Sequence, residues 1–167
     1  MTLSFESAIL LITIILTGLS AGLCFSWSNS VTPGLSQLDD VGYLQAFQSM
    51  NRAILNPVFF VVFLGPFFTH LANAYMTRGA TGAAFWLPIA ASVLYIGGLV
   101  LVTVFKNVPI NEVLDKTDLL TASAEELKML RARFEASWSQ WHMVRTVSAT
   151  LAFVLLVLQL YLTNKVA

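Results

Sequence analysis

Charged residues are scarce in this chain. Only 11% of its 167 residues are Asp, Glu, Lys or Arg, whereas a soluble domain usually carries about 25%. Nine basic residues balance nine acidic ones, so the sequence gives no reason to expect a nucleic-acid partner. Hydrophobic residues make up 57% of the chain. This composition is typical of a single integral-membrane domain covering residues 1–167, with the lipid bilayer as its surroundings.

Cysteine is nearly absent. Cys24 is the only one, so an intramolecular disulfide and the CxxC chemistry of membrane thiol oxidases are both excluded. The sequence also lacks an HxxxH pair, a glycine-rich phosphate loop and a nucleophile elbow. No Asp or Glu lies inside the long apolar stretches. This absence argues against a helix-bundle di-iron centre and against a proton-coupled transporter, since both depend on buried acids.

Four apolar stretches are long enough to cross a bilayer, because a helix of about 20 apolar residues spans the hydrocarbon. We predict spans at about residues 7–28, 54–75, 84–105 and 146–163. The predicted fold is therefore all-α, a four-helix transmembrane bundle. The first stretch is long and has no Lys or Arg before it, so we expect a retained helix rather than a cleaved signal peptide.

Amphipathic helical segments are predicted in the first and third loops. Ser36 to Asp39 resembles a capping box, and the apolar residues around it recur at helical spacing, which favours a helix lying at the membrane interface. These apolar residues are Leu38, Val41, Leu44, Phe47 and Met50. In the third loop, either Thr121 or Ser123 with Glu126 marks a helix start. No Pro or Gly follows, so we expect that helix to continue into the fourth span.

Proline is expected to end two of the helices. It has no backbone N–H, and it disfavours helix for the residue before it. We therefore expect the first helix to break at Thr32-Pro33-Gly34 and the third to stop at Pro109.

An even number of spans places both termini on one side of the membrane. Arg78 and Lys165 lie on that side, whereas the other seven basic residues lie on the opposite side. The positive-inside rule then puts the two large loops in the cytoplasm, which for a bacterial protein means an inner-membrane location. The sequence does not fix an oligomeric state and leaves a homo-oligomer open.

Three polar clusters should reach the same membrane surface, at the loop-bearing end of the bundle. They are residues 105–112, Asn51-Arg52 with Asn56-Pro57, and Trp138 through Thr146. They all lie within about one helical turn of one boundary, counting 1.5 Å per residue. An Arg or Trp at this depth can also be a simple interface anchor. The number of polar groups at one depth nevertheless predicts a binding site for a hydrophobic small molecule. Its candidate residues are Arg52, Asn56, Lys106, Asn107, Asn111, Trp138, Trp141, His142 and Arg145.

The two histidines lie near opposite surfaces. His142 opens the fourth span, whereas His70 lies about 16 residues into the second, roughly 24 Å from its start. They are too far apart to ligate one haem between them. Gln159 lies at almost the same depth as His70 on a parallel helix. Because a polar side chain in lipid needs a partner, we predict that His70 and Gln159 pair.

Three motifs together resemble the anthrone-oxygenase-like family of small four-span membrane proteins. They are Met50-Asn-Arg-Ala-Ile-Leu-Asn-Pro57, Asn107-Val-Pro-Ile-Asn111 and Trp138-x-x-Trp141-x-x-x-Arg145-Thr146, in the same order and with similar spacing. The resemblance covers nearly the whole chain and implies the four-span fold. Some members oxidise polyketide anthrones to anthraquinones with O2, and no classical cofactor is established for them. The sequence departs from the family at His142, where the usual residue is Asn.

The first functional hypothesis is therefore an oxidoreductase for a flat, lipophilic phenolic substrate, with no cofactor predicted. His142 would act as the base, since its ordinary pKa lies near neutrality. Arg52 and Arg145 would stabilise the anion, while the aromatic rings stack on the substrate and the remaining groups orient it. The stacking and orienting residues would be Asn56, Lys106, Asn107, Asn111, Trp138 and Trp141.

Two further hypotheses stay open. The same pocket could bind a quinone, lipid or other amphiphile without catalysis, or the protein could carry haem or a metal for redox chemistry. A visible absorption spectrum with metal analysis separates the last hypothesis from the other two.

Overall fold

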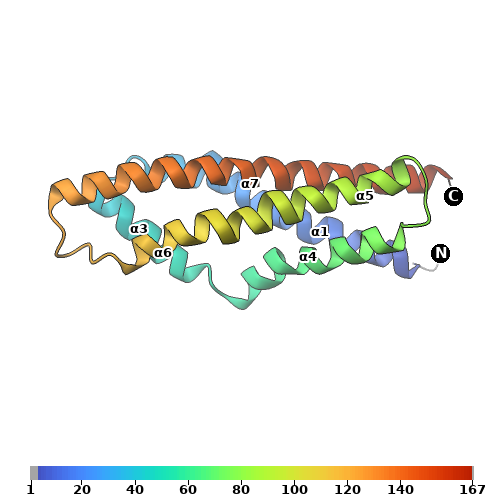
Figure 1. Ribbon diagram of the computed structural model, residues 1–167, viewed down its shortest axis with the longest axis horizontal. Helices are drawn as coiled ribbons and strands as arrows, with labels where there is room; N and C mark the ends of the chain where they lie inside the picture. Colours follow the sequence, from blue (N-terminus) through green and yellow to red (C-terminus); the bar gives the residue numbers. More distant parts are fainter. Residues whose placement is uncertain (1–3, 167) are drawn as a thin grey trace.

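The fold is built from four long helical stretches lying side by side (Figure 1). A computed structural model describes residues 4–166, with side chains described as far as residue 163. The first stretch is α1 (Phe5–Ser26), the π-helical turn η1 (Trp27–Val31) and α2 (Thr32–Leu35). The second comprises α3 (Asp40–Ala53) and, after a short link, α4 (Pro57–Met76). The third is α5 (Ala83–Val93), η2 (Leu94–Leu101), η3 (Thr103–Asn107) and α6 (Val108–Lys116), and the fourth is α7 (Ala124–Val166).

Four helical stretches of the described chain are long and apolar enough to cross a membrane. They are Phe5–Leu35, Pro57–Met76, Ala83–Lys116 and Ala124–Thr163. The start of α1 and the end of α7 lie at the same end of the bundle (Figure 1). The predicted all-helical, four-span fold is confirmed. The side of the membrane on which each end lies stays a prediction.

The hydrophobic side chains form two cores. One fills the bundle between α1, α4, α5–η2 and the second half of α7, and includes Tyr95, Leu99 and Leu156, all fully buried. The other lies at the opposite end from the termini, between α3, α6 and the first half of α7, and includes Phe47, Leu114 and Phe134. The second core turns the two large loops into a packed extension of the bundle.

Neither Pro33 nor Pro109 ends a helix, so that prediction is wrong. Each proline falls in the first turn of an α segment, where a missing N–H costs least. The turn before it is π-helical in both cases. Thr32 N–H bonds to the Trp27 carbonyl and Val108 N–H to the Thr103 carbonyl, each five residues back. This wider turn shifts the hydrogen-bond register so that the helix passes the proline.

The amphipathic segments exist, but the first begins later than predicted. Asp39, rather than Ser36, caps α3, because its Oδ1 accepts a 2.8 Å hydrogen bond from Gly42 N–H. Leu44 and Phe47 of the predicted apolar stripe are buried against α6 and α7, whereas Leu38 is exposed. In the third loop, Ser123 and Glu126 form the predicted capping box, since Ser123 N–H donates to the Glu126 carboxylate at 2.8 Å.

His70 and Gln159 do not pair as predicted. His70 Nε2 lies 3.1 Å from Thr17 Oγ1, and Nδ1 lies 3.3 Å from Ser92 Oγ. Gln159 instead exchanges two hydrogen bonds, of 2.9 and 3.1 Å, with Asn73, one turn along α4. Two amides complement each other as donor and acceptor, whereas a neutral imidazole offers one of each on opposite edges of its ring.

A double-mutant cycle tests this assignment. Asn73→Ala and Gln159→Ala are expected to show a coupling energy of about 1 kcal/mol in the free energy of unfolding, as for other interhelical hydrogen bonds in membranes. The matched cycle of His70→Ala with Gln159→Ala should give a coupling near zero. Unfolding of the purified protein in detergent measures both, and a larger coupling for the His70 cycle would contradict the assignment.

Candidate functional site

A cavity of about 470 Å³ lies where the two cores meet. It draws side chains from every long helical stretch, and its wall is mostly apolar but includes several polar and charged residues. The polar or charged lining residues are Ser20, Asn51, Arg52, Thr103, Asn111, Glu112, Asp115, His142 and Arg145. The aromatic lining residues are Trp27, Phe59, Phe60, Phe63 and Trp138. The predicted convergence of three distant segments therefore produces a real concavity.

Five of the nine predicted site residues line this cavity, namely Arg52, Asn111, Trp138, His142 and Arg145. Asn56 lies outside and caps α4, accepting a 3.0 Å hydrogen bond from Phe59 N–H. Lys106 is exposed, with its Nζ 4.9 Å from the centre of the Trp141 ring, outside the cavity. Asn107 is fully buried, and its Nδ2 donates to the Trp138 carbonyl at 3.3 Å.

Arg145 and His142 form a hydrogen-bonded chain anchored on α1. The Nε2–H of His142 donates to the Cys24 carbonyl at 3.1 Å, which places the ring proton on Nε2. The Nδ1 lone pair then accepts a 2.8 Å bond from Arg145 Nη2. Arg145 Nη1 donates to Thr103 Oγ1 at 3.3 Å. Both nitrogens of His142 are therefore engaged, and its contact with Arg145 fixes the orientation of the guanidinium.

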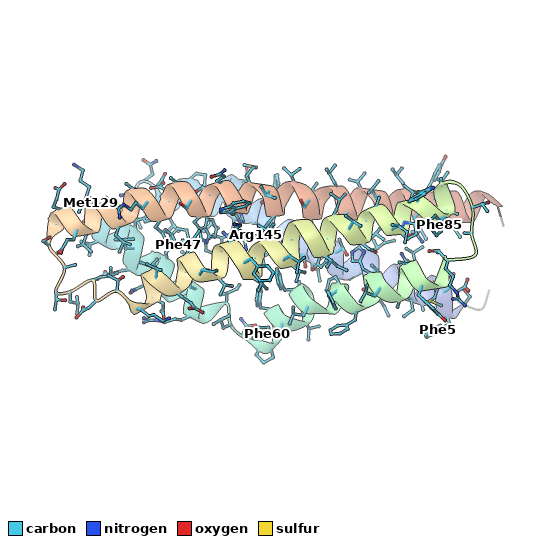
Figure 2. All side chains as sticks on the ribbon, viewed as in Figure 1. Phe5, Phe47, Phe60, Phe85, Met129 and Arg145 are labelled. Carbon is cyan, nitrogen blue, oxygen red and sulfur yellow. The ribbon has the colours of Figure 1, made fainter. Side chains whose placement is uncertain are left out.

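Aromatic rings pack around these hydrogen-bonded side chains of His142 and Arg145 and hold them in place. The His142 ring stacks on Trp138, with 4.6 Å between ring centres and planes 16° apart. The guanidinium carbon of Arg145 lies 5.4 Å from the centre of the Trp138 ring, within the range of a cation–π contact. Trp27 packs edge to face against His142 at 6.5 Å. Figure 2 places Arg145 on α7, between Phe47 of the second core and Phe85 near the other end of the bundle.

Arg145 has no carboxylate partner within the described part of the chain. The ion pairs there join Arg52 to Asp115, Lys116 to Glu112, and Arg131 to two acids. The Nε of Arg145 is also buried without a hydrogen-bond partner. A buried charge is costly unless an opposite charge compensates it. The cavity therefore presents a positive charge that a bound anion would neutralise.

Five buried side-chain atoms of the described chain lack a hydrogen-bond partner, and all five lie in or beside this cavity. They are the donors Asn51 Nδ2, Trp138 Nε1 and Arg145 Nε, and the acceptors Asn107 Oδ1 and Asn111 Oδ1. Buried polar atoms are almost always paired in folded proteins, and each orphan needs an explanation. A polar ligand in the cavity supplies one. An amide can also rotate by half a turn, so each Asn can serve as donor or acceptor.

Arg52 differs from Arg145 in its surroundings. Its side chain is largely exposed, and its Nε lies 2.6 Å from Asp115 Oδ1 across the space between α3 and α6. The carboxylate neutralises most of its charge at the edge of the cavity. The sequence suggested that Arg52 and Arg145 play the same role. In the structure Arg52 is paired with a carboxylate, whereas Arg145 has no carboxylate partner among the described residues.

The candidate site residues chosen from the sequence leave out several residues of the lining. Trp27, Cys24 and Ser20 of the first helical stretch face the cavity. They lie three or four residues apart, so helical spacing alone puts them on one face with the small polar residues of α1. Asn51 and Asp115 also belong to the lining, and no spacing rule connects these two.

The anthrone oxygenase family model matches residues 51–155, more than half of the chain. The chain belongs to the anthrone oxygenase family. The matched region contains the parts of α3, α4, η3, α6 and α7 that line the cavity, while Ser20, Cys24 and Trp27 lie before it. Searches of curated proteins and of solved structures find no match.

Proposed function

We propose that this anthrone oxygenase family member oxidises a flat, lipophilic phenolic substrate with O2 in the cavity around Arg145. The observation that carries the proposal is the partly buried guanidinium of Arg145, which has no carboxylate partner among the described residues and a buried, unpartnered Nε. An anthrone forms a delocalised anion when it loses a proton from its CH2 group. A fixed cation in a water-poor cavity stabilises such an anion strongly.

The reaction that we propose balances with O2 as the only co-substrate. A base takes one proton from the CH2 group, and the resulting carbanion, delocalised as an enolate, passes one electron to O2. The carbon radical and superoxide then combine to form a C–O bond, and protonation gives a hydroperoxide. Loss of water, with removal of the second C–H proton, leaves the ketone. The substrate CH2 thus becomes C=O, and the second oxygen atom leaves as water.

Arg145 would hold the enolate oxygen through its free Nε, and Trp138 Nε1 and Asn51 Nδ2 would donate to it or to a neighbouring oxygen. The base hypothesis for His142 fits the geometry poorly, because Arg145 already occupies the Nδ1 lone pair. We propose that His142 positions Arg145 instead. The carboxylates of Glu112 and Asp115, which line the same cavity, would accept the proton and pass it to water.

The aromatic lining of the cavity also favours a flat aromatic ligand. Trp27 and Trp138 both line the cavity, with 5.5 Å between their ring centres. Phe59 and Phe63 of α4 also line the cavity and stack on each other at 5.1 Å. Rings offer a broad apolar surface with little side-chain entropy to lose, so they suit a rigid polycyclic substrate.

The direct test is oxidation of a hydroxyanthrone by the protein reconstituted in vesicles. We expect anthraquinone formation and O2 uptake in equal amounts, clearly faster than autoxidation in protein-free vesicles of the same lipid. Quinone absorbance and an oxygen electrode measure the two quantities together. A rate no faster than autoxidation, with saturable binding of the hydroxyanthrone, would leave the protein as a non-catalytic binder of lipophilic anions.

A further inference from the structure

The cavity is bounded on one side by apolar side chains that also reach the outside of the molecule. Five such residues line it, and between 39% and 64% of each is exposed. They are Leu55, Phe60 and Leu64 from the start of α4 and the link before it, and Val104 and Val108 from η3 and α6. Side chains that face both the cavity and the exterior mark an opening between these two helical stretches. Figure 2 shows Phe60 at the outer edge of the bundle, where α4 begins.

This opening lies at a membrane-spanning level. Both helical stretches are apolar enough to cross a bilayer, and the residues flanking the opening are apolar and exposed as well. Val58 is 73% exposed, Val61 61% and Phe105 67%. In a membrane protein, apolar side chains as exposed as these face lipid acyl chains, since their contact with water would cost free energy.

Charged side chains lie about one helical turn from this opening, since Arg52 precedes Leu55 by three residues and Glu112 follows Val108 by four. Arg52 and Asp115 form their 2.6 Å ion pair between α3 and α6, and Glu112 pairs with Lys116 at 3.2 Å. All four side chains are exposed, the Asp115 carboxylate least of them. The cavity lining therefore combines an apolar, outward-facing opening, an exposed charged rim and the uncompensated Arg145.

From this arrangement we propose that the cavity is a lateral portal, which takes an anionic amphiphile directly from the bilayer. The anionic oxygen binds Arg145, and the apolar body extends through the opening between α4 and η3–α6. This inference rests on the ligand class of the proposed function, but not on the oxidation itself. It specifies the source of the ligand, which is the lipid phase rather than the aqueous solution.

Tryptophan quenching by dibromostearate tests the portal without any turnover. Its carboxylate supplies the anionic oxygen, and its brominated chain quenches nearby indole fluorescence. The protein carries Trp86→Phe and Trp141→Phe, so that the remaining Trp27 and Trp138 both line the cavity. In vesicles we expect saturable quenching, and Arg145→Ala should weaken its apparent affinity about tenfold or more.

Substitutions of residues at the opening, which make it narrower or wider, form the second part of the test. Val104→Phe with Val108→Phe should slow quencher association about tenfold or more, as expected when an access path is obstructed. Phe60→Ala should accelerate association, and the quenching in this variant should still weaken when Arg145 is replaced by alanine, which distinguishes a wider opening from a loss of packing. The matched control is Val93→Phe with Val113→Phe, on the same helical stretch. Both valines are at least 60% exposed, and neither lines the cavity, so the control should leave the rate unchanged.

Equal association rates in the narrowed, widened and control proteins would overturn the portal. The oxidation assay fails or succeeds independently of this result. A protein that shows the portal but does not oxidise hydroxyanthrones would retain this inference and reject the proposed function.

Discussion

Arg145→Ala is expected to lower the oxidation rate about 100-fold or more, because loss of one group that stabilises an oxyanion typically costs that much. The variant should nevertheless remain folded. Arg145 is a partly buried cation with no carboxylate partner among the described residues, so removing it relieves an uncompensated charge. Quinone formation in vesicles, together with thermal unfolding in detergent, measures both effects.

Arg133→Ala is the matched control for this prediction. Arg133 is an exposed arginine on the same helix, outside the cavity. Its removal changes the net charge by the same amount and should leave the rate unchanged. Arg145→Lys should give an intermediate rate, because one ammonium cannot replace three guanidinium nitrogens that contact Thr103, His142 and the ligand. Equal losses in the two alanine variants would contradict a specific role for Arg145.

The second large effect is expected at His142. His142→Leu should slow oxidation by about 10- to 100-fold, since it removes the acceptor that orients Arg145, and small misplacements of catalytic groups can cost that much. His142→Asn should retain most of the activity. The Asn side chain can accept from Arg145 through its oxygen and donate towards the Cys24 carbonyl through its nitrogen.

The pH dependence of His142→Asn separates positioning from base catalysis. An amide does not titrate, so an Asn variant with a normal rate and an unchanged pH profile supports positioning. If His142 were the base, the Asn variant would be slow near neutral pH, where the wild-type imidazole accepts the proton. That outcome would return the histidine to the catalytic role that the sequence suggested.

The sequence predicted the membrane fold well, because span length, capping and helical periodicity are local properties. It also grouped Trp138, His142 and Arg145 correctly, since residues three or four apart share one helix face. Counting residues to the membrane boundary then brought Arg52 and Asn111 to the same level. This argument uses only the position of a residue along its helix, and not the direction in which its side chain points. It could not show which side of its own helix Lys106 or Asn56 occupies, and both lie outside the cavity.

Pairings between distant segments could not be predicted in this way. The ion pair of Arg52 with Asp115 joins residues 63 positions apart, and the Asn73–Gln159 pair joins residues 86 apart. Each depends on how two helices are rotated about their axes. The helix continues beyond Pro109 because the turn at Thr103–Asn107 is π-helical, and such a turn has no simple sequence signature. The same turn precedes Asn111, which lines the cavity, and π-helical turns are frequent at functional sites.

The central claim is that the cavity binds its ligand as an anion on Arg145. The most direct measurement is the visible spectrum of a bound hydroxyanthraquinone, which resembles the proposed product and changes colour when its phenol ionises. We expect the wild-type protein in vesicles to hold the ionised form at a pH below the pKa of the free phenol in the same lipid. The Arg145→Ala protein should show only the neutral spectrum. A neutral spectrum for the ligand bound to the wild-type protein, or the same ionised spectrum in both proteins, would contradict the claim.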